Sequence, residues 1–144
     1  MRSCFLALVL LAPHSAAAEG VLDAREAFRL IDASRTEAGL VITWDVAPGY
    51  ALYRDRIRVA TPTPGALAGV PFLPAGTMAA DGLGGSAEEY LEPFTMLIPV
   101  TAAAYGHVSV RLQGCHMREP LVCFPPFSVD VPVEGVPGGF SPRG

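Results

Sequence analysis

The segment GHVSVRLQGCHMREPLVCFPPFSVDVPV, residues 106–133, contains two alternating runs separated by a loop with two cysteines. Residues 108–113 carry Val or Leu at every second position, and residues 128–133 carry Val at every second position. A period of two is typical of β-strands that bury one face. The segment therefore predicts a β-hairpin, with Cys115 and Cys123 facing each other across its end.

The rest of the chain repeats this pattern in shorter pieces, with turn clusters rich in Gly, Pro and Asp between them. Four further strands are expected, at residues 27–33, 39–46, 56–60 and 94–100. Residues 94–100, FTMLIPV, are apolar except for Thr95 and predict a strand buried on both faces. Helical periodicity is confined to a turn or two within residues 21–28. Six or seven short strands in about 110 residues predict an all-β chain folded as an immunoglobulin-like β-sandwich.

The first 18 residues have the layout of a cleavable signal peptide. Arg2 provides the positive charge, residues 5–12 the apolar run, and Ala16 to Ala18 the small-residue cleavage site. The run is much shorter than the roughly 20 residues of a membrane span, although a retained anchor is the alternative. We expect an exported, soluble domain over residues 19–144, with a loose Gly- and Pro-rich tail from about residue 134.

The net charge of the chain is −4, and all ten basic residues are Arg. They are scattered along the sequence and form no basic stripe of the kind that binds nucleic acid. We therefore expect no nucleic-acid partner. No cofactor is expected either.

The two cysteines of residues 19–144 would meet an oxidising environment after export. A disulfide that closes a loop of about nine residues is worth roughly 2.6 kcal/mol, against about 4.7 for a loop near 100 residues. Such a bridge would be a weak staple, which favours a redox role. His116 and Arg118 could favour a thiolate at Cys115, or they could be solvated loop residues. Gly114 would allow a partner's backbone to approach closely.

A family resemblance rests on four motifs in order: GYALYRDRIRV (49–59), LPAG (73–76), DGLGGSAEEY (81–90) and LQGCHMREPLVCFPP (112–126). Together they resemble the N-terminal periplasmic domain of DsbD-type thiol:disulfide interchange proteins. The resemblance covers residues 27–133. It implies an immunoglobulin-like fold, a periplasmic location and transfer of electrons to oxidised thioredoxin-fold proteins.

The resemblance also implies roles for the two cysteines. Cys123 corresponds to the cysteine that forms mixed disulfides with partners, and Cys115 to the cysteine that resolves them. The chain would then be a monomeric thiol:disulfide oxidoreductase. Because the family's membrane and thioredoxin-like domains are not in this sequence, its electron donor would be a separate membrane-bound or thioredoxin-like protein.

Other residues of the motifs are implied to support the cysteines. Tyr53 matches an active-site tyrosine, and His116 lies beside Cys115. Asp81 opens a cap loop in which Leu83 stands at the position of the family's shielding phenylalanine. Two departures are visible: Ala51 replaces a second aromatic residue, and the cysteine spacing is two residues longer than in the best-known members.

Two other functions are consistent with the residues. One is an immunoglobulin-like binding module with a structural disulfide. The other is a Cu(I) site, because soft ligands cluster in the sequence: Cys115, His116, Met117 and Cys123, with Met78 or Met96 as further candidates. The identity of the donor and acceptor, the direction of electron flow and the reduction potential are left open by the sequence.

Overall fold

The structure, a computed structural model, describes residues 20–81 and 84–136. The expected signal peptide, the cap residues Gly82 and Leu83 and the tail beyond residue 136 lie outside the described residues. Within the described residues, no helix is long and apolar enough to cross a membrane.

One layer of the molecule is a four-stranded antiparallel sheet with the strand order β12-β1-β2-β7. Its strands are β1 (Phe28–Thr36), β2 (Gly39–Val46), β7 (Phe94–Ile98) and β12 (Gly135–Val136). The one-turn helix α1 (Ala24–Ala27) precedes β1 and starts with a capping box between Asp23 and Glu26, which satisfies amide donors at its first turn. The expected short helix and the strands at 27–33 and 39–46 are thus confirmed.

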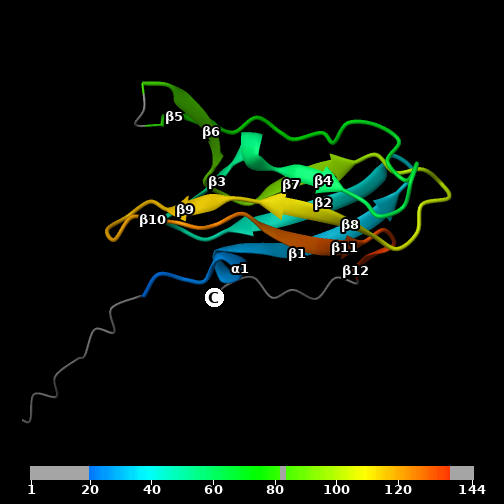
Figure 1. The fold of residues 1–144 in the computed structure, drawn as a ribbon, viewed down its shortest axis with the longest axis horizontal. Helices are drawn as coiled ribbons and strands as arrows, with labels where there is room; N and C mark the ends of the chain where they lie inside the picture. Colours follow the sequence, from blue (N-terminus) through cyan, green and yellow to red (C-terminus); the bar gives the residue numbers. More distant parts are fainter. Residues whose placement is uncertain (1–19, 82–83, 137–144) are drawn as a thin grey trace, which may run out of the picture.

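The facing layer is built from two antiparallel sheets that continue into each other. The first has the order β11-β8-β4 and contains β4 (Arg58–Ala60), β8 (His107–Leu112) and β11 (Phe127–Pro132). The second has the order β10-β9-β3-β6-β5 and contains β3 (Tyr50–Tyr53), β5 (Thr77–Ala80), β6 (Ser86–Tyr90), β9 (Gly114–His116) and β10 (Val122–Cys123). Gln113 alone separates β8 from β9. The 3₁₀ turn η1 (Arg54–Arg56) lies in the connection between β3 and β4. Figure 1 shows β9 and β10 at one end of the sandwich, with β5 and β6 projecting beside β3.

The core lies between the two layers and follows the alternation predicted from the sequence. Its largest fully buried side chains are Trp44, Phe28, Leu40, Ile42, Leu52, Met96, Ile98, Leu112, Val108, Val110, Val131 and Val133. Burying a side chain of this size contributes about 1.5–3 kcal/mol. Trp44 is completely buried and its indole nitrogen donates to Met96 Sδ at 3.3 Å.

The prediction that residues 94–100 are buried on both faces was wrong. Strand β7 alternates: Phe94, Met96 and Ile98 are buried, whereas Thr95 is exposed. Leu97, on the outer side, is partly covered by a crossing segment whose Phe72 exchanges two backbone hydrogen bonds with it, at 2.8 and 3.1 Å. Hydropathy alone does not show whether the outer face of a strand is covered by a single crossing segment, as here, or by a second packed sheet.

Candidate redox-active disulfide

Cys115 and Cys123 form a disulfide at the projecting end of the sandwich. They are directly opposite each other in the β9–β10 hairpin, and their Cα atoms are 4.0 Å apart. The placement across a hairpin end, predicted from the alternating runs on either side, is confirmed.

The two cysteines differ strongly in exposure. Cys115 is 2% exposed, because β9 lies between β10 and β3 and Cys115 pairs with Ala51 on its inner side. Cys123 is exposed, because β10 is the outermost strand of this sheet. A thiolate from another protein can therefore approach the sulfur of Cys123 more readily than that of Cys115, and thiol exchange depends on such access.

Gly114 has a different role from the one expected. It is buried, and a Cβ atom there would collide with the carbonyl oxygen of Ala51 and the ring of Phe28. The close approach that this glycine permits is thus internal, between β9 and β3, and not to a docking partner. That expectation was wrong, because the sequence does not reveal which backbone lies against the glycine.

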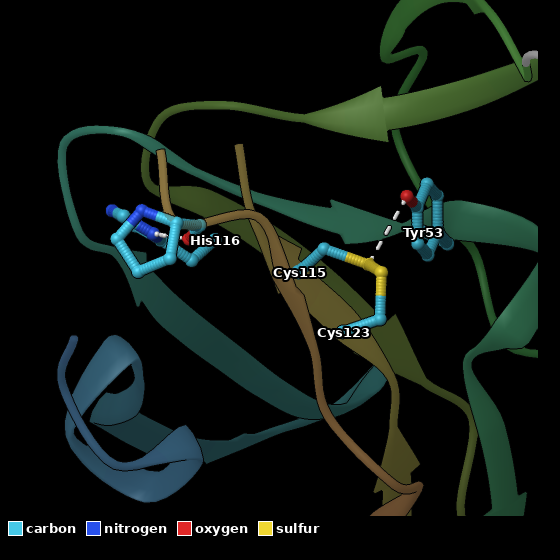
Figure 2. Close-up of a disulfide and its surroundings, with 5 residues drawn as sticks. Tyr53, Cys115, His116 and Cys123 are labelled. Carbon is cyan, nitrogen blue, oxygen red and sulfur yellow. Dashed lines mark hydrogen bonds between the residues drawn. A yellow bond between two sulfur atoms is a disulfide. The ribbon is translucent and has the colours of Figure 1, made fainter. Parts of the chain in front are cut away.

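Tyr53 lies beside the disulfide, where the resemblance placed it. Its hydroxyl donates a hydrogen bond to Cys115 Sγ at 3.3 Å (Figure 2). Burial, and after it the nearby charge of Glu89, raises the pKa of Tyr53 above its ordinary value. The phenol therefore remains a neutral donor across the physiological range, and a hydrogen bond of this kind stabilises a thiolate more than it stabilises a disulfide sulfur.

A pocket of about 470 Å³ opens over the disulfide. It is lined by Tyr53, Asp55, Arg56, Ala80, Asp81, Ala87, Glu89, Gln113, Cys115, Met117, Leu121 and Cys123. A larger hollow of about 610 Å³, lined by residues 74–77 and 89–95, contains neither cysteine. The smaller pocket is therefore the one associated with the disulfide.

Asp81 lies in the wall of this pocket and closes the turn that joins β5 to β6. Its carboxylate accepts a hydrogen bond from the amide of Gly85 at 2.9 Å, and its own amide donates to the carbonyl of Gly85 at 3.1 Å. Gly84 has a φ of 90°, a conformation that favours glycine. Asp81 thus bonds to Gly85, and between them lies the segment expected to act as a cap, of which Gly82 and Leu83 are outside the described residues.

The structure does not bring His116 to the sulfur atoms. Neighbouring residues of a strand point to opposite faces, and His116 follows Cys115 in β9. Figure 2 shows the ring of His116 turned away from the disulfide. Its Nδ1 lies 2.8 Å from the carbonyl oxygen of Pro120, and its ring packs on Tyr50 with centroids 4.8 Å apart. Arg118 lies over Gly49 instead. Of the two readings left open by the sequence, the structure therefore favours loop residues that do not act on the Cys115 sulfur.

The residues suggested for Cu(I) are not assembled into a site. Cys115 and Cys123 are bonded to each other, and His116 points away from them. Across residues 20–81 and 84–136, no three His, Cys, Asp or Glu side chains are clustered so that they could hold a metal ion.

Sequence reasoning missed Glu89, which lines the pocket and is 5% exposed. Burial raises the pKa of its carboxyl group above the ordinary value. A signal was present: Glu88 and Glu89 are consecutive in a segment that forms a strand, so one of them has to point to each face.

Comparison with known proteins places this geometry in a family. The family model described as "Thiol:disulfide interchange protein DsbD, N-terminal" matches residues 18–134. The chain belongs to this family. Among curated relatives, DsbD of Yersinia pestis (strain Pestoides F) is 34% identical over 91% of this chain and 24% of its own length. DsbD of Cronobacter sakazakii is 37% identical over 73% of this chain and 18% of its own length. The chain thus spans about a quarter or less of the DsbD sequences it matches.

Solved structures of the DsbD N-terminal domain share the fold. The reduced domain from Neisseria meningitidis superposes with a TM-score of 0.65 at 23% identity, covering 79% of this chain and 90% of that one. The DsbD N-terminal domain in complex with the PilB N-terminal domain, from the same organism, gives a TM-score of 0.63 at 22% identity, covering 86% and 94%. The predicted immunoglobulin-like sandwich is confirmed by these DsbD domains.

Proposed function

We propose that the protein is a periplasmic thiol:disulfide oxidoreductase that passes electrons through Cys115 and Cys123 to oxidised thioredoxin-fold proteins. The observation that carries the proposal is the asymmetry of the bond: the exposed residue Cys123 is joined to the buried residue Cys115, whose sulfur receives a hydrogen bond from Tyr53. Membership of the DsbD N-terminal family supports the same chemistry.

The exposure of the sulfurs assigns an order to the reaction. In the reduced protein, the thiolate of Cys123 attacks a partner's disulfide, forms a mixed disulfide and releases one partner thiolate. Cys115 then loses its proton and attacks the Cys123 sulfur, which breaks the mixed disulfide and releases the second partner thiolate. Two electrons leave the protein, the partner becomes a dithiol and the Cys115–Cys123 bond is restored. A membrane-bound or thioredoxin-like donor reverses these steps.

The hairpin that holds the disulfide favours exchange over reinforcement. Strand β10 contributes two residues, Val122 and Cys123, and pairs with β9 alone. Strand β9 is also held on its other side by three register pairs with β3. Breaking the S–S bond therefore leaves Cys115 fixed in the sheet, whereas Cys123 is held by its pairing with β9 and by the next residue, Phe124, which packs against Phe28 and Tyr50. This arrangement suits a disulfide that opens when another protein attacks Cys123.

The surroundings of Cys123 fit a protein partner. Met117 is 43% exposed and Leu121 is 61% exposed, and both line the pocket over the disulfide. Exposed apolar side chains beside a reactive group favour docking of another protein. The solved complex of a DsbD N-terminal domain with a PilB domain is consistent with an interface of this kind.

Trapping experiments test the proposal. We expect Cys115→Ala to accumulate a mixed disulfide with an oxidised thioredoxin-fold protein, because Cys123 attacks and nothing resolves the product. The matched variant Cys123→Ala should accumulate none, as followed by non-reducing electrophoresis and mass spectrometry. Adduct on Cys123→Ala alone would reverse the two roles. Absence of adduct on both variants, with a reduction potential below about −300 mV, would mark an inert structural disulfide and reject the function.

A further inference from the structure

Glu89 is a buried carboxyl group that the exchange steps above do not use. It is 5% exposed and is the one charged residue that is buried in the part of the chain that the structure describes. Among the fully buried side-chain nitrogen and oxygen atoms of those same residues, Arg29 Nε is the one without a hydrogen-bond partner, so the carboxylate oxygens of Glu89 keep access to the solvent of the pocket that it lines. Charged side chains are rarely as buried as this one, and Glu89 directs its charge into the pocket over the disulfide.

The strand register places Glu89 on the same face of the sheet as both cysteines. Tyr53 in β3 pairs with Glu89 in β6, and Ala51 in β3 pairs with Cys115 in β9. Side chains two residues apart in β3 share a face, so Cys115, Tyr53 and Glu89 share one as well. All three line the pocket over the disulfide. Glu89 therefore faces the tyrosine whose hydroxyl contacts the Cys115 sulfur.

The other charged groups near Glu89 do not neutralise it. Its neighbour Glu88 points to the opposite face, where it accepts a hydrogen bond from the amide of Gly76 at 2.7 Å and pairs with Arg54 at 3.4 Å. The remaining charged groups that line the pocket come from η1 and the end of β5: Asp55, Arg56 and Asp81. Arg56 and Asp55 are largely exposed and lie 3.9 Å from each other. The net charge of this lining is negative when Glu89 is ionised.

We propose that Glu89 is a positioning residue that controls how readily the Cys115 sulfur becomes a thiolate; this inference rests on the proposed function of the disulfide. An ionised Glu89 opposes a second negative charge in the same pocket, whereas a neutral Glu89 does not. Tyr53 acts in the opposite sense, because its hydroxyl stabilises the thiolate by hydrogen bonding.

The step affected is the departure of Cys115 when the protein is reduced. A reductant thiolate attacks Cys123 Sγ, the S–S bond breaks, and Cys115 leaves as a thiolate that then takes up a proton. The second thiol of the reductant attacks the mixed disulfide, releases the thiolate of Cys123 and completes a two-electron reduction, with the reductant oxidised to its disulfide. A leaving group with a lower thiol pKa leaves faster, so ionised Glu89 slows this step.

The sign of the pH dependence follows from the ionisation of Glu89. Burial raises the pKa of this carboxyl group above its ordinary value, so the neutral form persists to higher pH than it does for an exposed glutamate. Well below that pKa, Glu89 is neutral and does not slow the departure of Cys115. Well above it, Glu89 is ionised and slows that step fully.

The test compares Glu89→Gln with the wild-type protein during reduction by dithiothreitol, from about pH 4.5 to about pH 8.5. The fraction of free thiols is read by maleimide labelling and gel shift. Taking the ratio of the two rate constants cancels the ionisation of dithiothreitol. We expect the ratio to be smallest at the acid end and to rise to about tenfold at neutral pH and above, since a unit charge in a partly buried site changes such a step by about an order of magnitude.

Matched variants separate charge from packing. Glu89→Asp keeps the charge and should behave like wild type, and Glu88→Gln removes the neighbouring charge on the other face and should also give a ratio near one throughout. Glu89→Met, a second neutral variant, should reproduce the profile of Glu89→Gln and decides the question if the amide fails to fold. A flat ratio, a slower neutral variant or a pH-independent increase would overturn the role of Glu89. Failure of the wild-type protein to form mixed disulfides would instead overturn the proposed function itself.

Discussion

The consecutive strands β8 and β9, separated by Gln113 alone, are used in opposite ways. In β8, Val108, Val110 and Leu112 are fully buried in the core, and the strand pairs with β11 over six register positions. In β9, the partner strand β10 offers two register positions and the buried side chain is Cys115. Strand β8 is held by apolar packing between the layers. Strand β9 is held mainly by backbone pairing and by a bond that can be reduced.

This difference separates the source of stability from the source of reactivity. Apolar burial contributes in proportion to area, and the described core lies almost wholly in the sandwich. Because Cys115 lies outside that core cluster, its bond can open without disturbing the packing between the layers. Substitutions at the two ends should therefore have separable effects.

The largest effect is expected for Trp44→Ala in the sandwich. Trp44 is completely buried, and a change of this size should lower the free energy of unfolding by about 3–5 kcal/mol, measured by urea denaturation. The rate of disulfide reduction in the folded protein should change little. Val70→Ala, at a side chain that is 86% exposed, is the control and should stay within about 0.5 kcal/mol of wild type. A large loss of disulfide reactivity in folded Trp44→Ala would show that the two ends are coupled.

An effect of intermediate size is expected for Tyr53→Phe, which should change the rate of disulfide reduction more than the stability. The variant loses the hydroxyl that donates to Cys115 Sγ, and a hydrogen bond to a charged group is worth about 1.5–3 kcal/mol. Reduction by dithiothreitol should slow by about tenfold, while stability falls by about 1 kcal/mol or less. Rapid thiol labelling would measure the rate and urea denaturation the stability. An unchanged rate would mean that the hydrogen bond does not act on the leaving sulfur.

The smallest effect is expected for His116→Ala. The ring packs on Tyr50 and contacts Pro120, on the face away from the sulfur atoms. Stability should fall by about 1 kcal/mol or less, and the rate of disulfide reduction should match that of wild type between about pH 5 and pH 8. A rate that differed from wild type within this range would restore the role suggested by the position of His116 in the sequence.

The sequence predicted the longer strands because a period of two is a local property, and it did not predict the short strands β3, β5 and β6. The alternating runs at 108–113 and 128–133 correspond to β8 (His107–Leu112) and β11 (Phe127–Pro132), and their pairing brings Cys115 opposite Cys123. What was missed depends on contacts between distant segments. Phe72 crosses β7, Ala51 lies against Gly114, and the pocket encloses Glu89.

The same limit explains the outcome for His116. Adjacency to Cys115 in the sequence suggested electrostatic help, yet adjacency in a strand puts the two side chains on opposite faces. Tyr53, 62 residues away from Cys115 in the chain, is the residue that contacts its sulfur. Its place was predicted by the family resemblance and not by local pattern.

The outermost position of β10 also bears on self-association. A free sheet edge presents unpaired amide and carbonyl groups that can template a strand from another molecule. Here the chain leaves Cys123 through Phe124, whose amide is bonded to the carbonyl of Gly114, and then through Pro125 and Pro126, which have no amide hydrogen. Strand addition beyond Cys123 therefore lacks donors. A second copy, or an unfolded chain, can therefore react with a sulfur atom at this edge, but it meets no free amide donor from Phe124 to Pro126 with which to pair a strand.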